Sequence, residues 1–126
     1  MLKDYQKRVV KDIEDFFGIL DEHRKTGVPD YVSHAFTSSP KYRQYPERPL
    51  TGSGKIYPRV CIKMPTGGGK TLVAVETIRA YQNLLAKKKT GLVVWIAHRE
   101  SIYRQTIENL QTKSHPYRQL LDQASG

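Results

Sequence analysis

A glycine-rich loop between an apolar segment and a helical pattern most constrains the fold of this chain. Residues 64–71 read Met-Pro-Thr-Gly-Gly-Gly-Lys-Thr. The preceding residues, 60–64, form a short strand candidate, and apolar residues recur at helical spacing over 71–88. Glycines let a backbone curl around a phosphate group, and the helix that follows adds the positive end of its dipole. The pattern therefore predicts a strand–loop–helix unit that binds phosphate.

Each residue type in this loop has a distinct expected role. The cradle for the phosphates of ATP would be formed by Thr66, Gly67, Gly68, Gly69 and Lys70. The Lys70 ammonium would reach the β- and γ-phosphates and the Thr71 hydroxyl would bind Mg²⁺, which makes these two the candidate catalytic residues. The common motif has glycine where this chain has Met64. The alternative is a glycine-rich turn in which the Lys-Thr pair is incidental.

Two other segments imitate parts of such a site. Residues 51–55 also read Thr-Gly-x-Gly-Lys, but Ile56 replaces the metal-binding hydroxyl and Pro58 prevents a helix from starting nearby. We interpret them as a flexible turn. Residues 16–22 look like an apolar strand ending in Asp-Glu, but they continue the helical pattern of the N-terminus. We interpret them as the solvated end of a helix.

The segments after the loop predict an α/β fold. Residues 92–97 are continuously apolar and rich in β-branched side chains, which is typical of a parallel strand buried on both faces. Helical spacing covers residues 71–88, with Gly91 as the expected cap, and returns at residues 102–110. Strand, helix, strand and helix make a βαβα unit with a right-handed crossover. We therefore expect a parallel sheet covered by helices, in three layers.

The rest of the chain divides by composition. Residues 1–23 contain an amphipathic helix, whose apolar stripe runs from residue 2 to residue 20. Residues 24–59 hold five of the seven prolines and seven basic residues against two acidic ones, so we expect a long surface insertion. The βαβα unit would occupy residues 60–113, and residues 114–126 give no strong signal.

Bulk composition narrows the class of protein and its partners. The chain has 126 residues, with 21 Lys and Arg against 12 Asp and Glu, for a net charge of +9. This charge favours a polyanion, which could be a nucleic acid, a phosphate ligand or an acidic membrane surface, and charge alone does not choose among them. No apolar run approaches the length of a membrane span, and charged residues interrupt the N-terminus where a signal peptide would be apolar. A lone cysteine, Cys61, suits a reducing cytoplasm.

Three motifs resemble those of superfamily 2 helicases and translocases, a DEAD/DEAH-box-like group. The closest likeness is to the N-terminal ATPase region of the Res subunit of type III restriction enzymes. Leu-Lys-Asp-Tyr-Gln at residues 2–6 is similar to the opening motif of that group, and residues 64–71 are similar to its motif I. Residues 93–99, together with Gln105, resemble its motif Ia.

The resemblance implies roles that the residues alone do not. It makes Gln6 the residue that binds the adenine edge, whereas without it Gln6 is a polar residue in a first helical turn. It makes His98, Arg99 and Gln105 candidate contacts to a nucleic-acid backbone. It implies the P-loop NTPase (RecA-like) fold and a DNA helicase or translocase of a restriction system. The partners would be double-stranded DNA and a methyltransferase subunit.

Parts of the expected machinery are missing from the sequence. No Asp-Glu pair follows an apolar strand after residue 97, so we expect an N-terminal portion of a longer ATPase domain that is inactive alone. Two other functions stay open at this point. One is a non-catalytic, basic nucleic-acid-binding module with a vestigial loop, and the other is a P-loop ATPase unrelated to nucleic acid.

Overall fold

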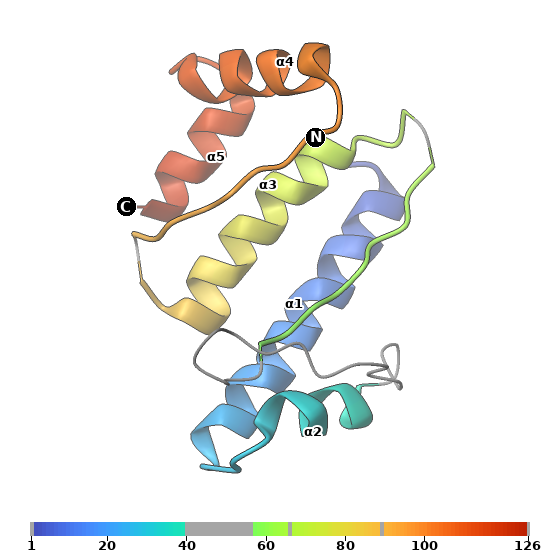
Figure 1. Ribbon diagram of the computed structural model, residues 1–126, viewed down its shortest axis with the longest axis vertical. Coiled ribbons are helices and arrows are strands. Elements are labelled where there is room, and N and C mark those ends of the chain that lie inside the picture. The colour runs from blue at the N-terminus through green and yellow to red at the C-terminus, as the bar shows by residue number, and fades with distance from the viewer. Residues whose placement is uncertain (1, 40–56, 66, 89, 126) are drawn as a thin grey trace. The chain divides into compact units, whose positions relative to one another are not determined.

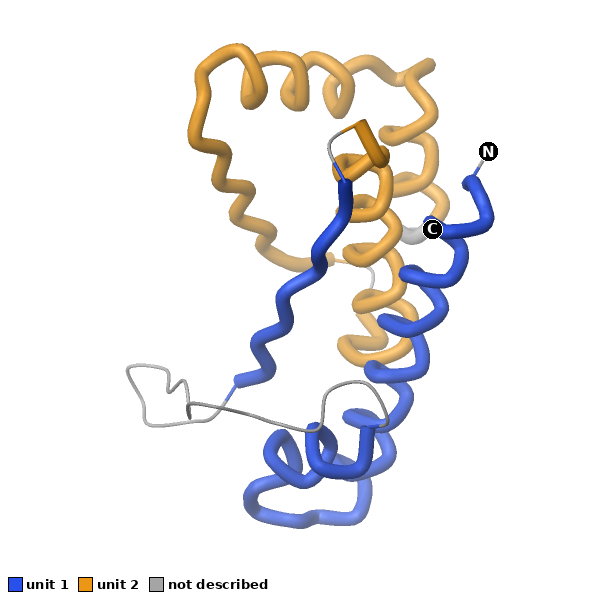
Figure 2. The backbone as a smooth tube through the Cα atoms, turned by 90° about the vertical axis from the view of Figure 1, so that its right-hand side faces the viewer, with its two compact units in different colours: residues 1–65 blue, residues 66–126 orange. Residues whose placement is uncertain are grey.

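The computed structural model describes residues 2–39, 57–65, 67–88 and 90–125. The chain divides into two compact units, residues 1–65 and 66–126 (Figure 2). The first unit contains α1 (Asp4–Lys25) and α2 (Tyr31–Ser38) (Figure 1). The second contains α3 (Lys70–Ala80), the π-helix η1 (Tyr81–Ala86), α4 (Glu100–Gln111) and α5 (Pro116–Ser125).

The core of the first unit lies between α1 and α2. Apolar residues at steps of three and four give α1 one buried face, as the sequence predicted. The side chains buried on the two helices are Val10, Ile13, Phe16, Phe17 and Leu20 from α1, and Val32, Ala35 and Phe36 from α2. The rings of Phe16 and Phe36 meet edge to face, with centroids 4.7 Å apart. This aromatic pair joins the two helices.

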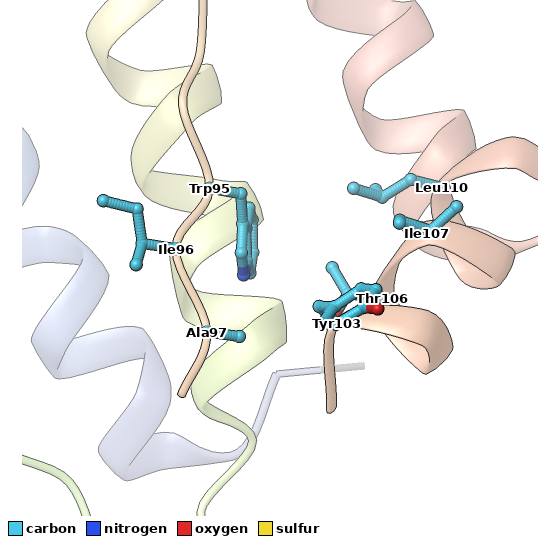
Figure 3. Close-up of a pocket in the computed structure, with 7 residues that line it drawn as sticks. All are labelled: Trp95, Ile96, Ala97, Tyr103, Thr106, Ile107 and Leu110. Carbon is cyan, nitrogen blue, oxygen red and sulfur yellow. The ribbon is translucent and has the colours of Figure 1, made fainter. Parts of the chain in front are cut away.

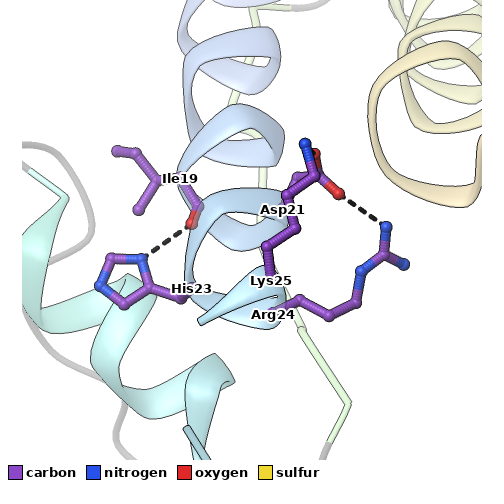
Figure 4. A network of polar contacts seen from close by, with 5 residues as sticks. All are labelled: Ile19, Asp21, His23, Arg24 and Lys25. Atoms are coloured by element: carbon purple, nitrogen blue, oxygen red, sulfur yellow. Dashed lines mark hydrogen bonds and ion pairs between the residues drawn. The ribbon is translucent and has the colours of Figure 1, made fainter. Parts of the chain in front are cut away.

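A polar cluster closes the last turns of α1 (Figure 4). Asp21 is only 7% exposed, and its carboxylate pairs with Arg24 Nη2 at 2.6 Å and with Lys25 Nζ at 3.0 Å. On the neighbouring turn, His23 Nδ1 donates a hydrogen bond to the Ile19 carbonyl over 2.8 Å. Burial of a carboxylate is costly unless it is paired, and the two cations supply that pairing. The Asp21-Glu22 pair therefore lies at the end of a helix, as predicted, but Asp21 is buried in an ion pair and is not solvated.

In the second unit, α3 contacts α5, and α5 contacts α4. The buried residues of α3 are Leu72, Val73, Val75 and Ala80. Arg118 of α5 reaches back to α4, where its Nη1 donates to the Leu110 carbonyl over 3.2 Å. The helical run leaves α geometry at Tyr81 and ends at Lys87, whose φ of 51° is left-handed. Gly91, the expected cap, has no left-handed φ, so that expectation was wrong.

The predicted three-layer α/β fold is wrong. Where the structure describes the chain, its elements are helices, and the strand candidates at residues 60–64 and 92–97 are unpaired extended backbone. A strand is stabilised by a neighbouring strand, and the local pattern that predicted these two does not supply one. Without a sheet to cover them, apolar side chains of residues 92–97 face solvent. Leu92 is 92% exposed and Ile96 is 88% exposed.

Two helices lie where the sequence predicted none. Residues 31–38 of the expected insertion form α2, whose buried Val32, Ala35 and Phe36 have helical spacing. Pro116 begins α5, at a position where proline is favoured because the first N–H groups of a helix lack partners. The remainder of the insertion, residues 40–56, lies outside the described residues, as does the Thr-Gly-x-Gly-Lys imitation. None of the helices seen in the described ranges is long and apolar enough to cross a membrane.

Candidate functional site

The glycine loop ends in a conformation that requires glycine. Gly67 has a φ of 74° and Gly69 a φ of 78°, both in the left-handed region that side chains disfavour. Gly69 is the N-cap of α3, and its carbonyl accepts the first helical hydrogen bond, from Val73 N at 3.1 Å. Gly68 between them is buried. The two glycines therefore turn the chain sharply into the start of α3.

The first turn of α3 presents the predicted functional side chains. Lys70 is the first residue of the helix and is exposed, and Thr71 follows it, partly buried. Because the N-cap is a glycine, no N-cap side chain hydrogen-bonds to the amides of this turn. Helix N-terminal amides attract anions, and here a cation and a hydroxyl stand beside them. The arrangement fits a phosphate group, with the predicted Thr66 lying outside the described residues.

Gln6 sits in a different setting, in the first turn of α1. Its side chain is only 5% exposed, and its Oε1 accepts a hydrogen bond from the Lys3 main-chain N–H over 2.8 Å. A glutamine three residues after the N-cap commonly satisfies an unpaired amide in this way. The sequence predicted a polar Gln6 in a first helical turn, but this bond was not predicted. The three-residue spacing of Lys3 and Gln6 at the start of a helix could have indicated this bond.

The candidate nucleic-acid contacts lie at and within α4. His98 and Arg99 are exposed, and Arg99 is the N-cap residue of this helix, with its carbonyl accepting from Ile102 N and Tyr103 N at 3.2 Å each. Gln105 is exposed on the helix itself. The structure therefore exposes all three residues to solvent, and the start of α4 engages only the backbone carbonyl of Arg99.

Comparison with protein families gives one match that covers nearly the whole chain. Residues 1–124 match the family described as type III restriction enzyme, res subunit. The chain belongs to this family. The family suspected from the three motifs is thereby confirmed, and the match supports a helicase-like ATPase region of a restriction enzyme subunit. Neither a curated protein nor a solved structure matches the chain.

A metal ion at the loop of this Res-family chain would need ligands from side chains or from the nucleotide. Within the ranges that the structure describes, no three side chains of His, Cys, Asp or Glu are placed to hold a metal ion together. Mg²⁺ in nucleotide sites keeps several waters and takes oxygen atoms from the substrate phosphates. The Thr71 hydroxyl is thus the oxygen that the first turn of α3 offers to such an ion.

The Res-family chain also has an apolar pocket that the sequence did not predict (Figure 3). It has a volume of about 330 Å³ and lies between residues 95–97 and α4. Trp95 and Ala97 face α4, while Ile96 points to the other side of the segment (Figure 3). The remaining lining residues are Tyr103, Thr106, Ile107 and Leu110. The helical spacing of apolar residues over 102–110 predicted that α4 has an apolar face, but we expected this face to pack against a sheet.

Proposed function

We propose that this chain is the ATP-binding part of a DNA translocase or helicase, acting as the Res subunit of a type III restriction enzyme. The observation that carries the proposal is the glycine turn into α3, with Lys70 and Thr71 in the first helical turn. The family membership supports the ATPase class, and the basic charge supports a DNA partner. A lone exposed thiol, Cys61, agrees with a cytoplasmic protein.

In this proposal, different residues bind the phosphates, the metal ion and the base of MgATP. The amides at the start of α3 and the Lys70 ammonium would hold the phosphates, and Thr71 would hold Mg²⁺ through its hydroxyl. Gln6 would read the adenine. When bound, the ion supplies charge neutralisation for phosphoryl transfer. The contribution of this chain is to bind and orient the phosphates, and it offers no adjacent Asp-Glu pair after residue 97 that could position a water.

The ATP site is tested by Lys70→Ala, with Lys88→Ala as the matched control. Both variants remove one exposed lysine, but Lys88 lies outside the loop. We expect Lys70→Ala to weaken binding of a fluorescent ATP analogue by tenfold or more, because a charge-assisted phosphate contact is lost, and Lys88→Ala to bind as the wild type does. Equal affinities in all three proteins, or no binding by the wild type, would refute the ATP site and favour the nucleic-acid-binding module.

Turnover and DNA binding distinguish the remaining alternatives. We propose that the isolated chain hydrolyses ATP slowly or not at all, because positioning of water, metal and charge must coincide. The measurement is the ATPase rate with and without double-stranded DNA. Strong DNA-stimulated turnover would contradict this part of the proposal. Binding of ATP without any salt-sensitive binding of DNA would instead favour a P-loop ATPase unrelated to nucleic acid.

A methyltransferase subunit as partner is part of the same proposal and is tested by co-purification.

A further inference from the structure

The apolar segment at residues 92–97 has both unpaired backbone groups and uncovered side chains. It contains no charged residue and no proline, and within the described part of the chain its backbone forms no hydrogen bond. Leu92, Val94 and Ile96 are all largely exposed, and Val94 is 73% exposed. Proteins usually protect an extended apolar segment with charge, proline or a covering element, because its N–H and C=O groups can pair with another chain. The apolar segment is therefore a candidate docking surface.

The two sides of the apolar segment differ. Neighbouring side chains of extended backbone point to opposite sides, so Ile96 points away from α4 while Trp95 and Ala97 face it (Figure 3). Trp95 and Ala97 are half-buried and, with α4 as the opposite wall, line the pocket of about 330 Å³. A peptide that pairs alongside an extended segment places every second side chain on the same side. One side chain of such a peptide could therefore enter the pocket.

Basic residues at both ends of the apolar segment argue against a second copy of this chain as the occupant. Lys88 precedes the segment and Arg99 follows it, and both are exposed. Antiparallel pairing of two copies would bring Lys88 of one towards Arg99 of the other, and parallel pairing would bring each residue towards its own copy. Like charges on opposite strands destabilise the pairing. Charge complementarity favours instead a partner with acidic residues at both ends of its apolar segment.

The residues between the basic ends also argue against a nucleic acid as the occupant of this surface. No acidic residue lies between Lys88 and Arg99, so the two ends alone would suit phosphate groups. The six residues of the apolar segment offer a phosphate no charge, and burial of a charge against apolar side chains is costly. An extended peptide with an apolar middle and acidic ends matches both parts of the surface.

We propose that residues 92–97 bind an extended, acid-flanked apolar segment of a partner protein by strand addition, with one large apolar side chain seated in the pocket against α4. Main-chain hydrogen bonds supply affinity, and the pocket supplies specificity. The acidic ends pair with the sides of the surface where Lys88 and Arg99 lie. This interaction is additional to the proposed function and does not depend on the ATP site.

The first test uses synthetic peptides and the unmodified 126-residue chain. The probe is a fluorescein-labelled peptide with a central run of alternating valine and leucine and a pair of aspartates at each end. One control peptide has the same run between lysines, and another has the same aspartates around serine and glycine. We expect fluorescence anisotropy to show that the probe binds about tenfold tighter than either control.

The second test asks whether the peptide pairs through its backbone. Every second N–H of a strand points to the same edge, so N-methylation of alternate peptide residues removes the donors of one edge only. Two such peptides are made, one in each phase. We expect one phase to abolish binding and the other to bind as the probe does. Simple adhesion between apolar surfaces would not distinguish the two phases.

The third test removes one wall of the pocket with Ile107→Ser, and its matched control is Ile102→Ser. Both side chains are exposed on α4, at 47% for Ile107 and 40% for Ile102, but only Ile107 lines the pocket. We expect Ile107→Ser to weaken binding of the probe about tenfold, because buried apolar contact is lost, and Ile102→Ser to change it little. Circular dichroism verifies that both variants keep their helices.

The outcomes that would overturn the proposal are specific to each step. Equal binding of the lysine-flanked peptide removes the charge argument, and equal binding of the serine and glycine peptide indicates a surface for polyanions. Unchanged binding in both N-methylated phases excludes strand addition. Equal effects of Ile107→Ser and Ile102→Ser exclude the pocket. A dimer of the chain alone that Val94→Asp dissociates, measured by sedimentation, would assign the surface to a second copy. The peptide comparisons require no variant, so they decide the proposal independently of any loss of folding.

Discussion

At the scale of single residues, the conformation of the glycines is the strongest link between sequence and proposed chemistry. Gly67 and Gly69 occupy left-handed backbone, and an L-amino acid other than glycine there pays about 1–2 kcal/mol. The turn they make leads directly into the first turn of α3. The identity of these residues is therefore explained by backbone geometry before any ligand is considered.

Gly69→Ala is expected to lower the free energy of unfolding of the second unit by about 1–2 kcal/mol, because alanine disfavours its φ of 78°. Nucleotide affinity should fall as well. The control is Gly91→Ala, since Gly91 lies in the same unit without a left-handed φ and a Cβ there meets nothing within 4 Å. It should leave stability unchanged or raise it slightly. Urea unfolding followed by the fluorescence of Trp95 measures the free energy of unfolding of both variants. An equal loss of stability in Gly69→Ala and Gly91→Ala would contradict the requirement for glycine at position 69.

At the scale of elements, the first unit depends on a small contact between a long helix and a short one. An isolated helix of eight residues is unstable in water, so α2 is held by its buried face. The edge-to-face pair of Phe16 and Phe36 is at the centre of that contact. Removal of either ring should therefore release α2 as well as open a cavity.

Phe36→Ala is expected to cost about 3–5 kcal/mol of unfolding free energy, the usual range for loss of a buried phenylalanine. Thr37→Ala, at the exposed neighbour on the same helix, should change it by less than about 0.5 kcal/mol. Urea denaturation monitored by far-ultraviolet circular dichroism compares the two variants. A cost for Phe36→Ala as small as that of Thr37→Ala would show that the α1–α2 contact does not stabilise this unit.

The elements that the sequence predicted correctly are those specified by a pattern within one segment of the chain. The helices α1 and α4 are present near residues 2–20 and 102–110, because amphipathic spacing within one segment specifies them. The loop before α3 was predictable for the same reason. The helices α2 and α5 were missed, because patterns of eight and ten residues are short, and α2 also lies within the proline-rich residues 24–59. The strands failed because a strand requires a partner that no local pattern contains.

At the scale of the whole molecule, charge is distributed unevenly along the chain. No acidic residue occurs between Glu76 and Glu100, a stretch that contains three consecutive lysines and ends at Arg99. Basic residues that neutralise DNA phosphates release counterions, so binding of this kind weakens as salt rises. The net charge of +9 therefore predicts salt-sensitive binding to DNA of any sequence.

Arg99→Gln is expected to reduce the slope of log K against log salt for double-stranded DNA by about 1, equally for unrelated sequences, if Arg99 contacts one phosphate. Arg104→Gln is the control, because Arg104 is exposed on the same helix but forms an ion pair with Glu100. We expect it to change the slope less. A salt titration by fluorescence anisotropy gives both slopes. DNA affinity that is independent of salt would contradict an electrostatic interface.

The single thiol of the chain gives the structure a practical use. Cys61 is exposed and lies in the extended segment that leads to the glycine loop. A maleimide dye would therefore modify one known position without any engineered cysteine. The dye would be only a few residues from Met64 and the start of the motif, so its emission could report nucleotide binding in real time. The same label would show whether the surroundings of Cys61 change when DNA or another subunit is added.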